Sequence, residues 1–116
     1  MPVSIIEFLK HIRDEINFLV EESNNIGFEQ FLNDEVRKRA FSRSLEIIGE
    51  AVKKIPDDIK LKYPLVEWKD IAGMRNKLIH EYFGIDYELV WDVVKSEIPE
   101  LKKHIEKIIE IESDCM

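Results

Sequence analysis

Apolar residues recur every three or four positions along almost the whole chain, which is the period of one face of an α-helix. No stretch shows the sustained alternation that a half-buried strand would need. Near the N-terminus, Ser4 precedes the first apolar stripe and Glu7 follows three residues later, a pattern typical of a helix N-cap. This first stripe consists of Ile5, Leu9, Ile12, Ile16 and Leu19.

Turn-forming residues divide the remaining pattern into further helices. Asn24, Asn25 and Gly27 predict a turn, after which helical spacing continues over residues 28–55. This region is expected to break near Asn33, where Asp34 can cap a new helix, and to end at Pro56. A connector over residues 56–65 follows.

The next helix is predicted from about Glu67 to Phe83, with Gly84 as its C-terminal cap. Asp86 is expected to cap the helix after it, and Pro99 suits the first turn of a final helix. The pattern therefore predicts an all-α fold. We expect a single domain, residues 1–116, folded as a bundle of about five helices.

Two glycines within predicted helices require an explanation, because each costs about 1 kcal/mol relative to alanine. Gly49 lies in the long second region, and Gly73 lies in the helix predicted from Glu67. Either they are tolerated imperfections or they permit close approach of these two helices. The second interpretation is favoured slightly, and it predicts that both glycines face a neighbouring helix.

The composition restricts the classes of function. With 45% hydrophobic and 35% charged residues, the chain is typical of a folded helical domain. No apolar run reaches the length of a membrane span and no secretory signal is evident, so a cytoplasmic protein is expected. The single cysteine, Cys115, provides neither a disulfide framework nor a thiolate metal site.

The formal charge of −7 argues against general binding along a nucleic-acid backbone. Any contact with RNA would have to be local. The densest basic stretch is Arg37-Lys38-Arg39, followed by Arg43. Clusters of this kind are more often a solvated helix face than a binding site.

The segment from Met74 to Tyr82 carries the most informative chemistry. It contains Arg75, Asn76, His80 and Tyr82 within about two helical turns. A histidine can move protons near neutral pH, and an arginine presents a planar set of donors that suits a phosphate. This pairing suits cleavage of a phosphodiester without a metal ion. The zinc motif HExxH is absent, because Gly84 stands where its second histidine would be.

On a straight helix, Arg75 and Tyr82 fall within the apolar arc, whereas Asn76 and His80 share a neighbouring face. Arg75 then needs a carboxylate partner, a subunit interface or a bound anion. A structural role is the commoner outcome for such a residue, with Glu46 or Glu50 as the partner.

On that same straight helix, Arg75 and His80 point about 140° apart, so one copy of the segment does not converge on a substrate. Either the helix distorts near its end, or two copies form a composite site across a two-fold axis. The composite site is expected.

The chain resembles the HepT-like branch of the HEPN superfamily, the toxin partners of minimal nucleotidyltransferases. The resemblance covers almost the full length and is strongest in residues 45–51, 68–76, 80–86 and 90–91. The motif is an arginine, then four residues, a histidine, one residue and a tyrosine, here Arg75, His80 and Tyr82. It would be weak alone, but these flanking segments make it specific.

The resemblance implies an all-helical homodimer that acts as a metal-independent RNA endonuclease, the toxin of a type VII toxin–antitoxin pair. Arg75 and His80 match the family's catalytic positions, and Asn76 matches the polar residue beside them. Tyr82 matches the tyrosine that the partner nucleotidyltransferase modifies with AMP. No cofactor and no metal are implied. The RNA is unspecified, with tRNA and mRNA both open, and DNA is not expected as a substrate.

The alternative is a non-catalytic helical dimer that binds nucleotide or RNA and serves as a partner-docking subunit. Arg75 would then anchor an anion or form a structural ion pair. The acidic net charge mildly favours this alternative.

Overall fold

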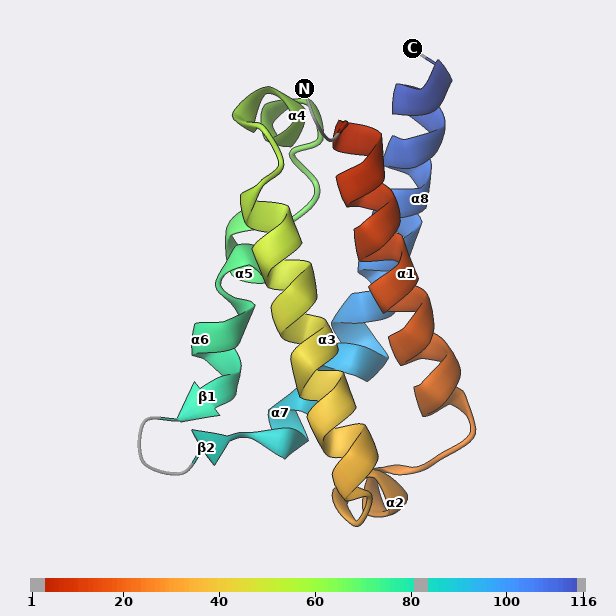
Figure 1. The fold of residues 1–116 in the computed structure, drawn as a ribbon, viewed down its shortest axis with the longest axis vertical. Helices are drawn as coiled ribbons and strands as arrows, with labels where there is room; N and C mark the ends of the chain where they lie inside the picture. The colour runs from red at the N-terminus through yellow and green to blue at the C-terminus, as the bar shows by residue number, and fades with distance from the viewer. Residues whose placement is uncertain (1–3, 81–83, 115–116) are drawn as a thin grey trace.

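Three long amphipathic helices form the body of the molecule in the computed structural model, which describes residues 4–80 and 84–114. These are α1 (Ile5–Asn24), α3 (Glu35–Lys53) and α8 (Ile98–Asp114). Helix α1 packs against both α3 and α8, and the short segments of the motif lie on the other side of α3 (Figure 1). The predicted all-α fold is confirmed.

The apolar stripes predicted from the sequence form one continuous core. The stripe of α1 is buried apart from Ile5, which is partly buried, and it meets the buried faces of the other two long helices. The largest fully buried side chains are Phe31, Phe41, Leu9, Ile12, Ile16, Leu19, Leu45, Ile48, Ile98, Ile105, Ile108 and Val52.

The predicted helix starts are confirmed by their hydrogen bonds. The Ser4 side chain accepts from the Glu7 backbone N–H at 3.2 Å. The Asp34 and Asp86 carboxylates accept from backbone N–H groups at 3.0 Å, at the starts of α3 and α7 (Tyr87–Asp92). Each cap satisfies a donor that the first helical turn would otherwise leave unpaired.

Short elements fill the space between the long helices. Helix α2 (Phe28–Leu32) precedes α3, and α4 (Asp57–Lys62) occupies the connector after Pro56. Helix α7 continues through a π-helical turn, η1 (Val93–Glu97), into α8. Pro99 lies in the first turn of α8, as predicted. None of the helices within the described ranges is long and apolar enough to cross a membrane.

An aromatic cluster fixes the start of α7 against the bundle. The Phe31 ring stacks on Phe41 with centroids 5.1 Å apart, and its centroid lies 5.2 Å from that of Trp91 and 6.5 Å from that of Tyr87. Aromatic pairs at these separations add about 0.5–1.5 kcal/mol beyond the area they bury. The cluster joins α2, α3 and α7 directly after the motif segment.

Candidate active site

The motif segment is broken into short elements, and the prediction of one helix from Glu67 to Phe83 is wrong. Helix α5 (Trp68–Ala72) ends at Gly73, α6 (Met74–Leu78) follows at once, and the chain then becomes extended. Residues Ile79–His80 form strand β1, which pairs antiparallel with β2 (Gly84–Ile85). These elements lie along one side of α3 (Figure 1).

Strand pairing explains why α6 stops at Leu78. The Asp86 backbone N–H donates to the Leu78 carbonyl at 2.8 Å, which satisfies a group that the helix end would leave open. Ile79 is β-branched and has extended dihedrals, φ −102° and ψ 122°. Gly84 therefore lies in β2 rather than capping a helix, and its φ of +75° is a conformation that other residues rarely adopt.

Gly49 confirms the predicted close approach of α3 to the motif. A Cβ atom at Gly49 would lie 3.0 Å from the Ile71 carbonyl oxygen and 3.7 Å from the Met74 Cβ. Gly73 does not fit the same prediction, because a Cβ there would meet only the carbonyls of Lys69 and Asp70, in α5 itself. Gly73 instead marks the break between α5 and α6.

Arg75 is exposed, which overturns the prediction that it lies within an apolar arc. The suggested partners are engaged elsewhere: Glu46 lies 3.9 Å from Arg43, and Glu50 lies 3.3 Å from Lys53. Within residues 4–80 and 84–114, Arg75 forms no ion pair and no side-chain hydrogen bond. Its guanidinium is therefore not held by either of the carboxylates proposed from the sequence.

The remaining residues of α6 explain how Arg75 is presented. Met74 and Leu78, four residues apart, are buried and attach the helix to the core. Lys77 forms an ion pair with Glu97 of η1 at 3.2 Å, and this contact joins α6 to η1. Asn76 is exposed beside Arg75. One face of a five-residue helix is thus fixed, and the other presents an arginine and an asparagine.

His80 and Tyr82 are the two candidate residues that the structure leaves partly or wholly undescribed. The backbone of His80 pairs with Gly84 in the strand pair, and its side chain lies outside the described part. Tyr82 lies in residues 81–83, also outside it. Because His80 is not on the helix, the angle of 140° expected for a straight helix no longer applies. Distortion of the helix, one of the two alternatives, is what occurs here.

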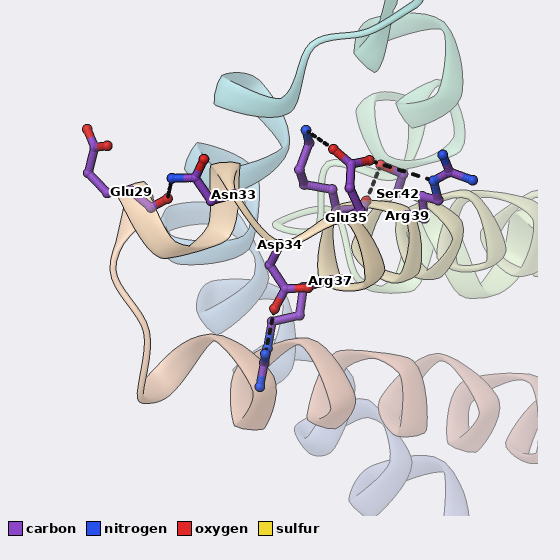
Figure 2. A network of polar contacts seen from close by, with 8 residues as sticks. Glu29, Asn33, Asp34, Glu35, Arg37, Arg39 and Ser42 are labelled. Carbon is purple, nitrogen blue, oxygen red and sulfur yellow. Dashed lines mark hydrogen bonds and ion pairs between the residues drawn. The ribbon is translucent and has the colours of Figure 1, made fainter.

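The basic stretch at the start of α3 is largely neutralised by acidic partners. Arg37 contacts Asp34 at 2.7 Å and Glu22 at 3.2 Å. The pKa of Asp34 is lowered, chiefly because its carboxylate accepts hydrogen bonds from the backbone and side chain of Arg37. Lys38 pairs with Glu35 at 3.1 Å, and Figure 2 shows Arg39 directed at the same carboxylate.

Two features near the motif were not predicted from the sequence. The ion pair between Lys77 and Glu97 joins residues 20 positions apart, for which no local pattern exists. The left-handed conformation of Gly84 in β2 had a possible signal, because glycine suits any left-handed position and not only a helix end. Among the described residues, no group of three or more His, Cys, Asp or Glu side chains could hold a metal ion.

Comparison with known proteins decides the family. Residues 5–108 match the model of the family described as "Ribonuclease HepT-like". The chain belongs to the HepT-like ribonuclease family. The resemblance stated from the motif and its flanks is therefore confirmed, and it places the chain among ribonucleases rather than among enzymes of another class.

Curated relatives of this HepT-like chain cover most of its length. A protein of Caldanaerobacter subterraneus subsp. tengcongensis named "Putative RNase" is 52% identical over 90% of this chain and 94% of its own. A "Probable ribonuclease HepT" of Thermococcus cleftensis is 45% identical over 88% and 93%. In Methanocaldococcus jannaschii, a protein named "Gamma-glutamylcyclotransferase and putative RNase" is 41% identical over 89% of this chain and 46% of its own. No solved structure matches the chain.

Proposed function

We propose that this HepT-like chain is a metal-independent RNA endonuclease in which Arg75 and His80 are the catalytic residues. The observation that supports this most directly is the exposed Arg75 guanidinium, which no described carboxylate holds, on a helix fixed from behind by Met74 and Leu78. Burying or pairing the charge would have supported a structural role. An exposed, positioned arginine suits a bound phosphate instead.

In the proposed reaction, the ribose 2′-hydroxyl attacks the adjacent phosphorus. The new bond to the 2′-oxygen forms as the bond to the 5′-oxygen breaks, which leaves a 2′,3′-cyclic phosphate and a 5′-hydroxyl. His80 takes the proton of the 2′-hydroxyl or gives one to the leaving oxygen, an effect worth about 10²- to 10⁴-fold. Arg75 stabilises the charge that builds on the phosphate oxygens.

Asn76 has a supporting role in this proposal. Its exposed amide lies next to Arg75 in α6, so it can hold either the phosphate or the histidine in position. An Asn76→Ala variant is expected to slow cleavage less than Arg75→Ala does, since a neutral hydrogen bond is weaker than one from a charged donor.

We further propose that two chains form the site together, as a homodimer. One chain supplies one Arg75 and one His80. A two-fold axis would bring a second arginine and a second histidine to the same phosphodiester. Mixing inactive Arg75→Ala and inactive His80→Ala chains tests this. Activity that returns on mixing supports a shared site, and two variants that stay inactive together, despite exchanging subunits, contradict it.

The deciding experiment is cleavage of an RNA oligonucleotide in EDTA. Wild-type protein is expected to cut it and leave cyclic phosphate ends, whereas His80→Ala is expected to be inactive. An oligonucleotide with a 2′-deoxyribose at the cleaved position should resist, because the nucleophile is gone. Cleavage that EDTA abolishes, or that the deoxy substitution leaves intact, contradicts the mechanism.

The proposed biological role is that of a toxin paired with a minimal nucleotidyltransferase, which silences it by attaching AMP to Tyr82. The added phosphodiester brings negative charge and bulk close to Arg75 in sequence, so it can compete for the guanidinium. Intact mass of protein produced together with its neighbouring gene product should reveal AMP. Tyr82→Phe should lose the adduct and the suppression, whereas Tyr87→Phe should retain both.

A non-catalytic binding module remains the second candidate, and two observations favour it. The net charge is −7, and the basic stretch of α3 is largely occupied by acidic partners. Expression without the neighbouring gene product separates the two candidates. Toxicity that disappears in Arg75→Ala supports the nuclease, and growth unaffected by the wild-type chain supports the module.

A further inference from the structure

A groove lies beside the motif, on the side of α6 away from Arg75. It is lined by the segment before α5, by α5 itself, by Met74 and by the junction of η1 with α8, and its volume is about 250 Å³. Arg75 and Lys77 point about 160° apart on α6. Lys77 reaches Glu97 in the groove wall at 3.2 Å, so the groove and Arg75 lie on different faces of α6.

The floor of this groove is apolar, and four acidic residues line its edges together with Ser96 and His104. The carboxylates of Glu67 and Asp70 line the α5 side, and those of Glu97 and Glu100 line the α8 side. At one end, Leu65 is 82% exposed. The buried apolar residues of the floor are Val66, Ile71, Met74, Ile98 and Leu101.

The acidic residues on the two sides differ in their partners. Glu97 is paired with Lys77, and Glu100 is paired with Lys103 at 3.2 Å. Glu67 and Asp70 form no ion pair with any residue of the described ranges. Asp70 instead raises the pKa of Glu67, through a shared hydrogen bond and its own negative charge. Two carboxyl groups thus lie close together at the edge of an apolar surface.

We propose that the groove is a docking site for a protein partner whose inserted segment carries a lysine or arginine next to an apolar side chain. A long basic side chain buries its methylenes against an apolar wall and keeps its charged end near carboxylates. Ile71 and Met74 supply that wall, and Glu67 with Asp70 supplies the charge. The volume accommodates a few side chains rather than a whole helix, and the exposed Leu65 extends the apolar contact.

Occupation of the groove would reach the candidate active site through one residue. Met74 is part of the floor, and Arg75 is its direct neighbour in a helix of five residues. A partner that presses on Met74 therefore acts on the anchor that positions Arg75. This gives a protein partner a route to the motif that does not require access to its exposed face.

The test uses a short helical peptide with leucines along one face and lysines beside them, and a matched peptide in which glutamates replace the lysines. The lysine peptide is expected to bind and to shift the methyl NMR signal of Met74. A Glu67→Gln/Asp70→Asn variant should weaken this binding about tenfold, and added salt should weaken binding to the wild type.

The matched control is Glu106→Gln/Glu110→Gln, which removes two exposed carboxylates of α8 outside the groove. It is expected to bind the lysine peptide as the wild type does. Equal binding of the glutamate peptide, equal weakening by the control variant, or an unmoved Met74 signal would each overturn the proposal. Binding is measured without RNA, so its failure is distinct from failure of the nuclease reaction.

Discussion

The three-helix body and the motif segment differ in how they are held in place. Helices α1, α3 and α8 contain 20, 19 and 17 residues, and each buries a full apolar stripe. The motif consists of two five-residue helices and two two-residue strands. Isolated helices this short are not stable in water. The motif therefore depends on α3 for its conformation, while its own exposed residues are left available for chemistry.

If this division is correct, the largest loss of stability should come from the body. Phe41 is fully buried in α3 and stacks on Phe31. Phe41→Ala is expected to lower the free energy of unfolding by about 3–5 kcal/mol, measured by urea denaturation. Phe18→Ala is the matched control, because Phe18 contacts the same ring but is 38% exposed. Equal losses in the two variants would contradict a core centred on Phe41.

The opposite result is expected at Arg75, where activity should fall while stability stays the same. Arg75→Ala should slow RNA cleavage by about 10²- to 10³-fold, because charge on the phosphate loses its stabilisation. Its free energy of unfolding should change by less than about 0.5 kcal/mol, as for other exposed positions. Arg75→Lys keeps the charge but loses the planar set of donors, so it should recover only part of the rate.

Lys69→Met is the control for this prediction, because it removes an exposed cation from the adjacent helix α5. Its rate should remain close to that of the wild type. If Lys69→Met slowed cleavage as much as Arg75→Ala, the effect would come from local charge and not from a catalytic arginine.

Gly49 connects the two regions, and a single methyl group there tests the connection. Alanine would gain about 1 kcal/mol in helix propensity, but its Cβ would lie 3.0 Å from the Ile71 carbonyl. Overpacking of this kind costs about 1–3 kcal/mol. Gly49→Ala is therefore expected to lower the free energy of unfolding by up to about 2 kcal/mol and to reduce the cleavage rate severalfold.

Gly27→Ala is the matched control, because a Cβ there would meet no atom within 4 Å. It should lower the free energy of unfolding by no more than about 1 kcal/mol, because alanine is a poorer N-cap than glycine, and it should leave cleavage unchanged. A Gly49→Ala protein that was more stable and fully active would show that α5 is not held tightly against α3.

The difference between the three-helix body and the motif segment also separates what could be predicted from the sequence from what could not. The caps at Ser4, Asp34 and Asp86 and the stripe of α1 depend on neighbours within one helical turn, and all were predicted. The end of α6 depends instead on the pairing of β1 with β2, which helical spacing does not encode. Gly84 was assigned to a helix end because helix ends and turns both use the left-handed conformation that glycine permits.

The predicted position of Arg75 was wrong for a related reason. Placing residues 68–82 on one straight helix put Arg75 in the arc of Trp68 and Ile71. The break at Gly73 rotates α6 relative to α5, and Arg75 then faces solvent. A helical wheel is reliable only as far as the helix is continuous. The family was recognised correctly, because residue identity does not depend on that phase.

The smallest effect is expected where the connector before the motif meets the end of α8. The Glu112 carboxylate accepts from Lys62 at 2.8 Å and also from the Tyr63 hydroxyl. These two donors, Lys62 first, hold the pKa of Glu112 below its usual value of 4.5. Because the pKa is lower in the folded state, the contribution to stability is present at neutral pH and is lost as the pH falls through that lowered value.

Glu112→Gln should therefore lower the free energy of unfolding at pH 7 by less than about 1 kcal/mol. At a pH below that lowered pKa the difference from the wild type should shrink, since the wild-type carboxylate is then protonated. Glu110→Gln, an exposed change on the same helix, serves as the control. If the difference in the free energy of unfolding between Glu112→Gln and the wild type stayed constant between the two pH values, the contact of α8 with the connector would depend on packing and not on the charge of Glu112.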